Sequence, residues 1–208
     1  MPMTPQQLLE DALARHRGVL GCGIVFGDDA GASVGHDERE APFVPDDGDG
    51  EEPGFLISIT DEDPERLCAV VRVAEDSDVL GIGIDLASTE DWTGDERGER
   101  FAELLFTERE KALVSAADGL VPLLRAKVFS AKEAAFKSTA AALRRWYGSH
   151  DEELYFEARD FELVSWSESR GAGRRDRAAI ACEKLGISRI EVSFTEYAGM
   201  AFCVAIAC

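Results

Sequence analysis

Hydrophobic residues recur along the chain with two different periods, which predict a mixture of strands and helices. Period-two or continuous apolar runs predict strands at residues 19–26, 55–60, 67–74, 79–86, 154–167, 190–196 and 201–207. Helical spacing and helix-capping residues predict helices at residues 4–18, 99–106, 107–117, 122–146 and 178–185. Residues 27–54, rich in Asp, Glu, Gly and Pro, predict a loop. Helices between strands, with an antiparallel hairpin at the end, indicate an α+β fold.

The strand predicted at residues 79–86 has the sharpest pattern. Its apolar side chains share one face and are Leu80, Ile82, Ile84 and Leu86. The opposite face carries Gly81, Gly83 and then Asp85. Glycines within a strand usually mark a close approach by another backbone or by a ligand. On this pattern alone, Asp85 either starts a turn or serves as a functional carboxylate.

The helix predicted at residues 122–146 carries a carboxylate in an unexpected place. At 3.6 residues per turn, one face consists of Phe129, Glu133, Phe136 and Ala140. We expect this face to be turned to the core, and it is apolar apart from Glu133. A carboxylate in such a stripe is costly unless something pairs with it. The candidate partners are Lys137, one turn further along the helix, and a metal ion.

Two predicted hairpins share a short pattern. Ser58-Ile59-Thr60-Asp61 matches Ser193-Phe194-Thr195-Glu196, and an apolar strand follows each segment. This weak repeat, over about 20 residues, is what two related half-domains would show. We therefore expect halves at residues 1–78 and 79–208, the alternative being two unrelated hairpins.

Composition and charge narrow the functional classes. The chain has 208 residues and a net charge of −19, which argues against nucleic acid and anionic membranes as partners. Residues 1–80 hold nineteen acidic residues and five arginines, a net charge of about −14. This acidic half weighs against an anionic ligand lying on it.

Localisation can be predicted from the termini and the cysteines. No apolar stretch reaches the roughly 18 residues that a membrane span needs, and the first 20 residues do not resemble a secretion signal. The five cysteines form no Cys-x-x-Cys pair, and none of the three histidines clusters with a cysteine. We therefore expect reduced thiols, no zinc site and a cytoplasmic location.

Two motifs together suggest a magnesium and phosphate site. The Gly-x-Gly-x-Asp strand is followed, about 48 residues later, by Lys132-Glu133 and then Lys137 on a helix. Mg²⁺ is usually held by one or two carboxylates together with substrate phosphates, and lysines can neutralise the remaining phosphate charge.

This arrangement resembles the signature of the 4′-phosphopantetheinyl transferases. The matching segments are Gly83-Ile84-Asp85, Phe106-Thr107-Glu108-Arg109-Glu110 and Phe129-Ser130-Ala131-Lys132-Glu133-Ala134-Ala135-Phe136-Lys137. The resemblance covers residues 81–208 well and residues 40–80 loosely. It implies a 4′-phosphopantetheinyl transferase-like fold of two similar α/β halves forming a pseudo-dimer, as in the larger surfactin-type members. The segment Gly81–Leu86 looks more like the small holo-acyl-carrier-protein synthases.

The resemblance also implies a reaction. The enzyme would transfer the 4′-phosphopantetheine arm of coenzyme A to a serine of an apo acyl or peptidyl carrier protein, with Mg²⁺, and release adenosine 3′,5′-bisphosphate. Asp85 and Glu133 would be metal ligands, and Glu133 or a neighbouring water would take the serine proton. Lys137 would hold a coenzyme A phosphate, and Lys132 would assist catalysis. Arg125, Lys127, Arg144 and Arg145 are candidates for docking the carrier, against the simpler interpretation of a solvated helix face.

Three positions depart from the family pattern. Ala87 stands where larger members often have a second acid, and Ile59 stands where a histidine contacts the 3′-phosphate of coenzyme A. Ala41 replaces an expected lysine, although Arg39 is nearby. Coenzyme A would then be bound by Asp85, Lys137, Ser58, Thr60 and Arg39. These departures keep a second hypothesis open, in which the chain is a catalytically impaired homologue that binds a carrier protein or synthase. A third is an unrelated α+β protein with a chance motif.

Overall fold

The computed structural model describes residues 2–27, 35–36, 42–43, 54–93, 96–116, 120–139, 156–167 and 176–208. Its helices are α1 (Pro5–Leu13), α2 (Glu96–Leu105), α3 (Glu108–Ser115) and α4 (Val121–Ser138), with 3-10 turns η1 (Glu90–Trp92), η2 (Ala158–Asp160) and η3 (Glu183–Leu185). Its strands are β1 (Val19–Phe26), β2 (Gly35–His36), β3 (Pro42–Phe43), β4 (Phe55–Glu62), β5 (Glu65–Val73), β6 (Gly81–Ser88), β7 (Glu162–Ser167), β8 (Asp176–Cys182), β9 (Ile187–Tyr197) and β10 (Met200–Ala207). This mixture confirms the predicted α+β class.

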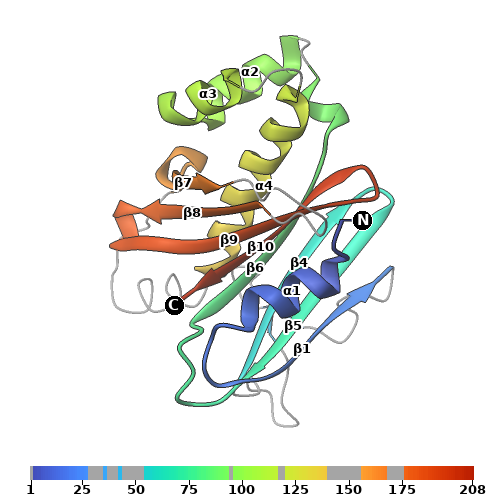
Figure 1. Ribbon diagram of the computed structural model, residues 1–208, viewed down its shortest axis with the longest axis vertical. Coiled ribbons are helices and arrows are strands. Elements are labelled where there is room, and N and C mark those ends of the chain that lie inside the picture. The colour runs from blue at the N-terminus through green and yellow to red at the C-terminus, as the bar shows by residue number, and fades with distance from the viewer. Residues whose placement is uncertain are drawn as a thin grey trace.

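Two antiparallel sheets repeat one strand order (Figure 1). The smaller sheet has the order β1-β5-β4, and the larger has the order β6-β10-β9-β8-β7. In each sheet, a single strand (β1 or β6) pairs with the second strand of a hairpin (β5 of β4-β5, or β10 of β9-β10). The shared order supports the internal repeat that Ser58–Asp61 and Ser193–Glu196 suggested. The smaller sheet lies within residues 1–78 and the larger within residues 79–208, although that division into domains stays a prediction.

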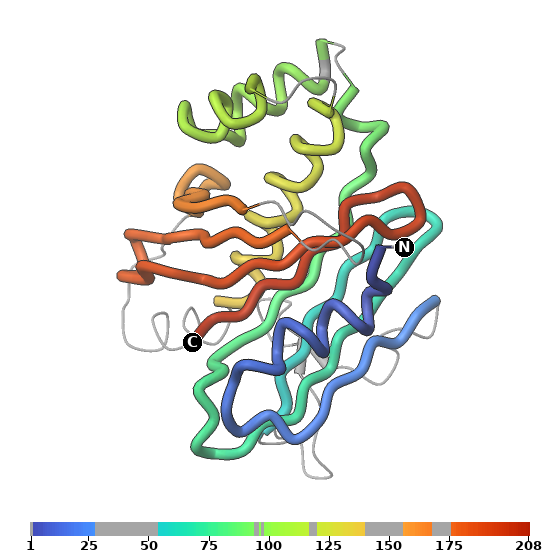
Figure 2. Tube along the Cα trace, viewed as in Figure 1, coloured from blue at the N-terminus to red at the C-terminus, as the bar shows by residue number. Residues whose placement is uncertain are grey.

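The two hairpins, β4-β5 and β9-β10, lie side by side with their turns at the same end of the molecule (Figure 2). The hydroxyl of Tyr197 donates a hydrogen bond of 3.3 Å to Glu65 at this end. Tyr197 also packs against Phe26, with ring centroids 6.0 Å apart. The smaller and the larger sheet are therefore in direct contact at this end of the hairpins.

Strands β6 and β10 separate two hydrophobic clusters. Ile82, Ile84 and Leu86 of β6 join α1 and β5 in one cluster. On the other face, Ala201, Cys203 and Ala205 of β10 pack with α4 and with the inner face of β7 to β9. The alternation of β6 is as the sequence predicted, because successive side chains of a strand point to opposite faces.

The glycines of β6 mark the close approach that the sequence predicted, and the approaching partner is the backbone of α4. A Cβ atom added at Gly83 would lie 1.8 Å from the carbonyl oxygen of Ala134, and one at Gly81 would lie 2.0 Å from that of Ser138. Neither distance can accommodate a side chain, since backbone atoms cannot move aside as a flexible side chain can. Small residues on α4 complete the fit, and Ala134 itself is fully buried.

The predicted orientation of α4 is wrong. Phe129 and Glu133 are only half-buried and Phe136 is 41% exposed, whereas Ala131 and Ala135 are buried. The core-facing side of α4 is therefore the small-residue side, because only small residues permit contact with the β6 glycines. The aromatic side chains cover the opposite side of α4 and pack on other segments. The ring centroid of Phe129 lies 5.2 Å from that of Trp92 in η1, and that of Phe136 lies 5.8 Å from that of Phe161.

One predicted helix is wrong, and the end of another differs from the structure. The helix predicted at residues 178–185 is strand β8 followed by η3. Its alanines favour a helix locally, but pairing on both sides with β7 and β9 overrides that propensity. Helix α4 ends at Ser138, with Thr139 as its C-terminal cap, rather than at residue 146. Residues 140–155 and most of the predicted loop at residues 27–54 lie outside the described residues.

Substituting Gly83 by Ala tests the contact between β6 and α4. We expect Gly83→Ala to lower the free energy of unfolding by about 3 kcal/mol or more, because overpacking against backbone forces the helix to shift. Urea denaturation measures the change. Gly23→Ala in β1 is the matched control, because a Cβ there would meet nothing within 4 Å. Equal stability losses in the two variants would contradict the proposed contact.

Candidate functional site

Asp85 lies on the face of β6 that is turned to α4 and is 5% exposed. Its Oδ1 accepts hydrogen bonds from Lys137 Nζ at 2.7 Å and from Thr60 Oγ1 at 3.2 Å. The hydroxyl of Ser130 donates to the Asp85 carbonyl oxygen at 3.0 Å, which fixes this point of the strand to α4. The other carboxylate oxygen, Oδ2, is buried and has no hydrogen-bond partner among the described residues.

Lys137 joins the strand to the helix. Its side chain is 29% exposed, and besides Asp85 it donates to the carbonyl oxygen of Ile84 at 3.2 Å. Within the described ranges, its ion pair is with Asp85 and not with Glu133. The simplest explanation for Glu133 on the helix, an ion pair one turn long, is therefore not what this structure shows.

Glu133 nevertheless shares an electrostatic environment with Asp85. Burial raises the pKa of Asp85 to about 6; Lys137 opposes this rise, and the neighbouring charge of Glu133 adds to it. Burial also raises the pKa of Glu133, and Lys137 lowers it. We refer to Asp85, Glu133 and Lys137 as the β6–α4 cluster. It holds two carboxylates and one ammonium group in a partly buried place.

Lys132 lies elsewhere, although the sequence placed it beside Glu133 as a catalytic candidate. Its ammonium group is buried, with a side chain 1% exposed, and bonds to both carboxylate oxygens of Glu110 at 2.6 Å. It also donates to the carbonyl oxygen of Phe161 at 2.8 Å. None of these three bonds is made to Asp85, and through them Lys132 links α4 to α3 and to the segment before β7.

Glu110 is the centre of that link, and its side chain is fully buried. It accepts hydrogen bonds from the backbone N–H groups of Thr107 at 2.8 Å and of Leu163 at 2.9 Å. The capping box of Thr107 and Glu110 could be read from the sequence. The pairing with Lys132 could not, because nothing in the local pattern joins residues that are far apart along the chain.

Of the described residues predicted to hold coenzyme A, Asp85 and Lys137 lie in the β6–α4 cluster, and the others do not. Ser58 and Thr60 are buried, and their hydroxyls accept hydrogen bonds from the backbone of β6 rather than facing outward. Arg39 lies outside the described residues. The docking candidate Lys127 is tied to Asp176 by an ion pair of 2.7 Å, and Arg144 and Arg145 also fall outside the described ranges.

The β6–α4 cluster fits a magnesium ion that is shared with a phosphate ligand. Asp85 Oδ2 is a buried acceptor without a donor, and Glu133 supplies a second carboxylate. Across the described part of the chain, no group of three or more His, Cys, Asp or Glu side chains is arranged to hold a metal. Ala87, where larger members often have a second acid, is buried and carries only a methyl group, so it supplies no ligand atom. Mg²⁺ needs no more than one or two protein carboxylates when phosphates and waters complete its shell.

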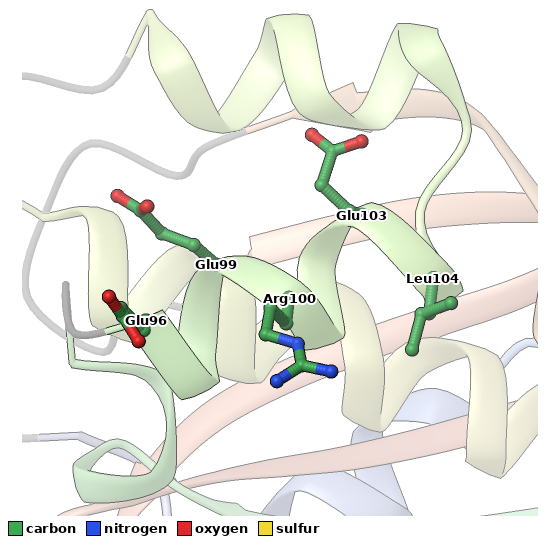
Figure 3. A pocket seen from close by; sticks show the side chains of 5 residues that line it. All are labelled: Glu96, Glu99, Arg100, Glu103 and Leu104. Atoms are coloured by element: carbon green, nitrogen blue, oxygen red, sulfur yellow. The ribbon is translucent and has the colours of Figure 1, made fainter.

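A separate hollow lies on α2 and is shown in Figure 3. Its lining residues are Glu96, Glu99, Arg100, Glu103 and Leu104. Acidic side chains predominate among the described lining residues, all of which come from α2. This hollow is unsuited to an anion such as coenzyme A, and it contains no member of the β6–α4 cluster.

The described fold is α+β, and it brings Asp85 of a strand to Lys137 of a helix that also carries Glu133. The family model of the 4′-phosphopantetheinyl transferase superfamily matches residues 81–199, which is more than half of the chain. The chain therefore belongs to this superfamily, and its membership supports phosphopantetheinyl transfer as the general activity. The matched segment contains the whole β6–α4 cluster. No curated protein matches the chain, and none of the helices in the described ranges is long and apolar enough to cross a membrane.

The raised pKa of Asp85 predicts that this side chain lowers stability above pH 6. The folded state holds the proton more tightly than the unfolded state does, so stability falls as pH rises from about 4 to 6. In metal-free protein at pH 7.5, we expect Asp85→Asn to raise the free energy of unfolding by about 1–2 kcal/mol. A shift of about two pKa units, which already includes the opposing effect of Lys137, corresponds to about 3 kcal/mol, and this is the upper limit of the expected gain.

Urea denaturation with chelator at pH 4 and pH 7.5 measures this difference. The gain should disappear at pH 4, where the native carboxyl group is already protonated. A variant that is less stable than the native protein by the same amount at both pH values would contradict the assignment.

The buried pair of Lys132 and Glu110 predicts a large structural effect. Lys132→Met leaves the Glu110 carboxylate buried without a counter-charge, and we expect a loss of about 3–5 kcal/mol in the free energy of unfolding. Adding Glu110→Gln should restore part of that loss, which a double-mutant cycle measures. Lys111→Met, which breaks ion pairs to the exposed carboxylates of Glu103 and Glu108, is the control and should change stability little. No recovery in the double variant would show that the two side chains are not coupled.

Proposed function

We propose that this protein transfers the 4′-phosphopantetheine arm of coenzyme A to a serine of an apo acyl or peptidyl carrier protein, with Mg²⁺, and releases adenosine 3′,5′-bisphosphate. The observation that supports this most is the β6–α4 cluster. Its members stand at the positions of the family motif, and one buried carboxylate oxygen is left without a donor. We further propose a cytoplasmic location, since carrier proteins and coenzyme A are available there.

Asp85 and Glu133 are the proposed Mg²⁺ ligands. When bound, the ion would offset the negative charge that develops on the pyrophosphate of coenzyme A. With Ala87 in place of a further acid, phosphate oxygens and waters would complete the coordination. A site with two carboxylates has less charge repulsion in the metal-free protein than a site with three. Lys137, which pairs with Asp85, reduces that repulsion further.

The side chains of the cluster can orient the reactants and move the proton. Glu133 would accept the proton of the carrier serine, directly or through one water, as its hydroxyl oxygen attacks the β-phosphorus of coenzyme A. Burial raises the pKa of Glu133 in the protein without a metal, and a bound Mg²⁺ would oppose that rise. Lys137 would share its ammonium group between Asp85 and a phosphate of coenzyme A. Lys132 would act at a distance, by fixing the rotation of α4 through Glu110.

The alternative function is that of a homologue with impaired catalysis that binds a carrier protein or a synthase. Ile59 at the expected histidine position favours it, together with the acidic character of residues 1–80. The buried hydroxyls of Ser58 and Thr60 add to this, because they are engaged with β6. The two functions differ in one property: only the first forms a covalent product on the carrier.

The mass of an apo carrier protein after incubation with the protein, coenzyme A and Mg²⁺ tests the transfer. We expect the carrier to gain the phosphopantetheine arm, and chelation of Mg²⁺ to abolish the gain. Glu133→Gln should reduce the rate by at least about 100-fold, because it removes both a metal ligand and the base. Glu99→Gln, on the exposed side of α2, is the matched control and should react at the native rate.

Absence of product across several carriers, together with no thermal shift on adding coenzyme A, would exclude the active transferase. Native activity in Glu133→Gln would leave the reaction in place but refute the site.

Comparing coenzyme A with dephospho-coenzyme A tests how the nucleotide end is held. We expect the two KM values to agree within about threefold, because the family's usual 3′-phosphate contacts are missing and no buried charge is lost with that group. Initial rates of carrier modification measure both values. A preference of tenfold or more for coenzyme A would show that a basic side chain, such as Arg39, has replaced the missing contacts.

A further inference from the structure

Strand β6 is the outermost strand of the five-stranded sheet, so one of its edges is not paired with another strand. Two N–H groups along it, those of Ile84 and Leu86, are directed toward β4. The hydroxyl of Ser58 accepts from Ile84 N at 2.9 Å, and that of Thr60 accepts from Leu86 N at 3.1 Å. Both hydroxyls are buried. Side chains of the smaller sheet thus satisfy an edge that would otherwise hold unpaired, buried donors.

The geometry at Thr60 determines where its proton goes. A hydroxyl has one donor and two acceptor lone pairs. Because Thr60 Oγ1 accepts from Leu86 N, its single proton is free for Asp85 Oδ1, 3.2 Å away. Thr60 therefore binds both the backbone N–H of Leu86, the residue after Asp85, and the Asp85 carboxylate. With Lys137 on the same Oδ1, both donors are at one end of the carboxylate, and Oδ2 stays without a partner.

We propose that Thr60 is a positioning residue for Asp85, and that the smaller sheet takes part in the reaction by presenting Oδ2 of Asp85 to the metal. This inference rests on the proposed function. It assigns to residues 1–78 a role that does not depend on holding the nucleotide. Thr60 also lies outside the segment that the family model matches, which begins at residue 81.

The internal repeat supplies a comparison for Thr60. Thr195 occupies the matching position of β9 and is equally buried, but its hydroxyl donates to the carbonyl oxygen of Met3 at 2.8 Å. Among the described residues it makes no hydrogen bond to a carboxylate. Loss of either hydroxyl removes a buried hydrogen bond of one hairpin. Only the loss at Thr60 changes the surroundings of Asp85, so Thr195→Val is a matched control for Thr60→Val.

The test uses the full chain and three variants: Thr60→Val, Thr60→Ser and Thr195→Val. Free Mn²⁺ is measured by electron paramagnetic resonance during titration in the presence of coenzyme A, with coenzyme A alone as the blank. We expect Thr60→Val to weaken Mn²⁺ binding by at least about tenfold, as is usual when a hydrogen bond to a metal ligand is removed. Thr60→Ser should bind within about threefold of the native protein, and Thr195→Val within about twofold.

Two further measurements separate positioning from general loosening. Amide hydrogen exchange at Leu86, without any ligand, should be at least about tenfold faster in Thr60→Val and unchanged in Thr195→Val. In the carrier assay, Thr60→Val should raise the Mg²⁺ concentration needed for half-maximal rate and lower kcat, while the KM for coenzyme A stays within about twofold.

Native Mn²⁺ affinity in Thr60→Val would overturn the inference. An equal loss in Thr195→Val would also overturn it, because the effect would then be one of stability. If the native protein itself binds no Mn²⁺, the proposed function fails and the positioning role fails with it. Failure of the inference alone is distinguishable, because it leaves native binding and transfer intact.

Discussion

The close contact between α4 and β6 is the constraint on which the rest of the structure depends. Gly81 and Gly83 let the helix backbone approach to a distance at which any side chain would collide with a carbonyl oxygen. That approach brings the ammonium group of Lys137 to 2.7 Å from Asp85 and lets Ser130 bond to the strand backbone. A wider spacing would separate the two carboxylates and the lysine. The glycines therefore matter for the site as much as for the packing of the sheet.

Two neighbouring residues of α4, Lys132 and Glu133, have different surroundings. Lys132 is buried in an ion pair with Glu110, which fixes the rotation and position of the helix against α3. Glu133, next in the chain, is only half-buried, and its charge acts on Asp85 while Lys137 acts on it. Separating Lys132 from Glu110 would leave a buried charge without a partner, so this pair holds its position. In the β6–α4 cluster, Asp85 Oδ2 has no hydrogen-bond donor among the described residues, which lowers stability and suits a ligand.

Much of this could be predicted from local patterns. The alternation of β6 and the capping box of Thr107 and Glu110 depend on residues close in sequence, and the superfamily was indicated by a motif. What could not be predicted depends on contacts distant in sequence. The β8 strand forms because two neighbours pair with it, despite its alanines. The side of α4 with small residues packs against the glycines of β6. Phe129 and Phe136 therefore lie on the other side of the helix. Ser58 and Thr60 were predicted to bind coenzyme A, but they lie against β6.

The most direct test of the account is a crystal structure with Mn²⁺ and coenzyme A, in which anomalous scattering locates the metal. The account predicts one strong peak that is coordinated by Asp85 and Glu133 and by the pyrophosphate, with Lys137 in contact with a phosphate oxygen. A metal and coenzyme A bound away from the β6–α4 cluster, with Asp85 and Glu133 still unligated, would contradict it.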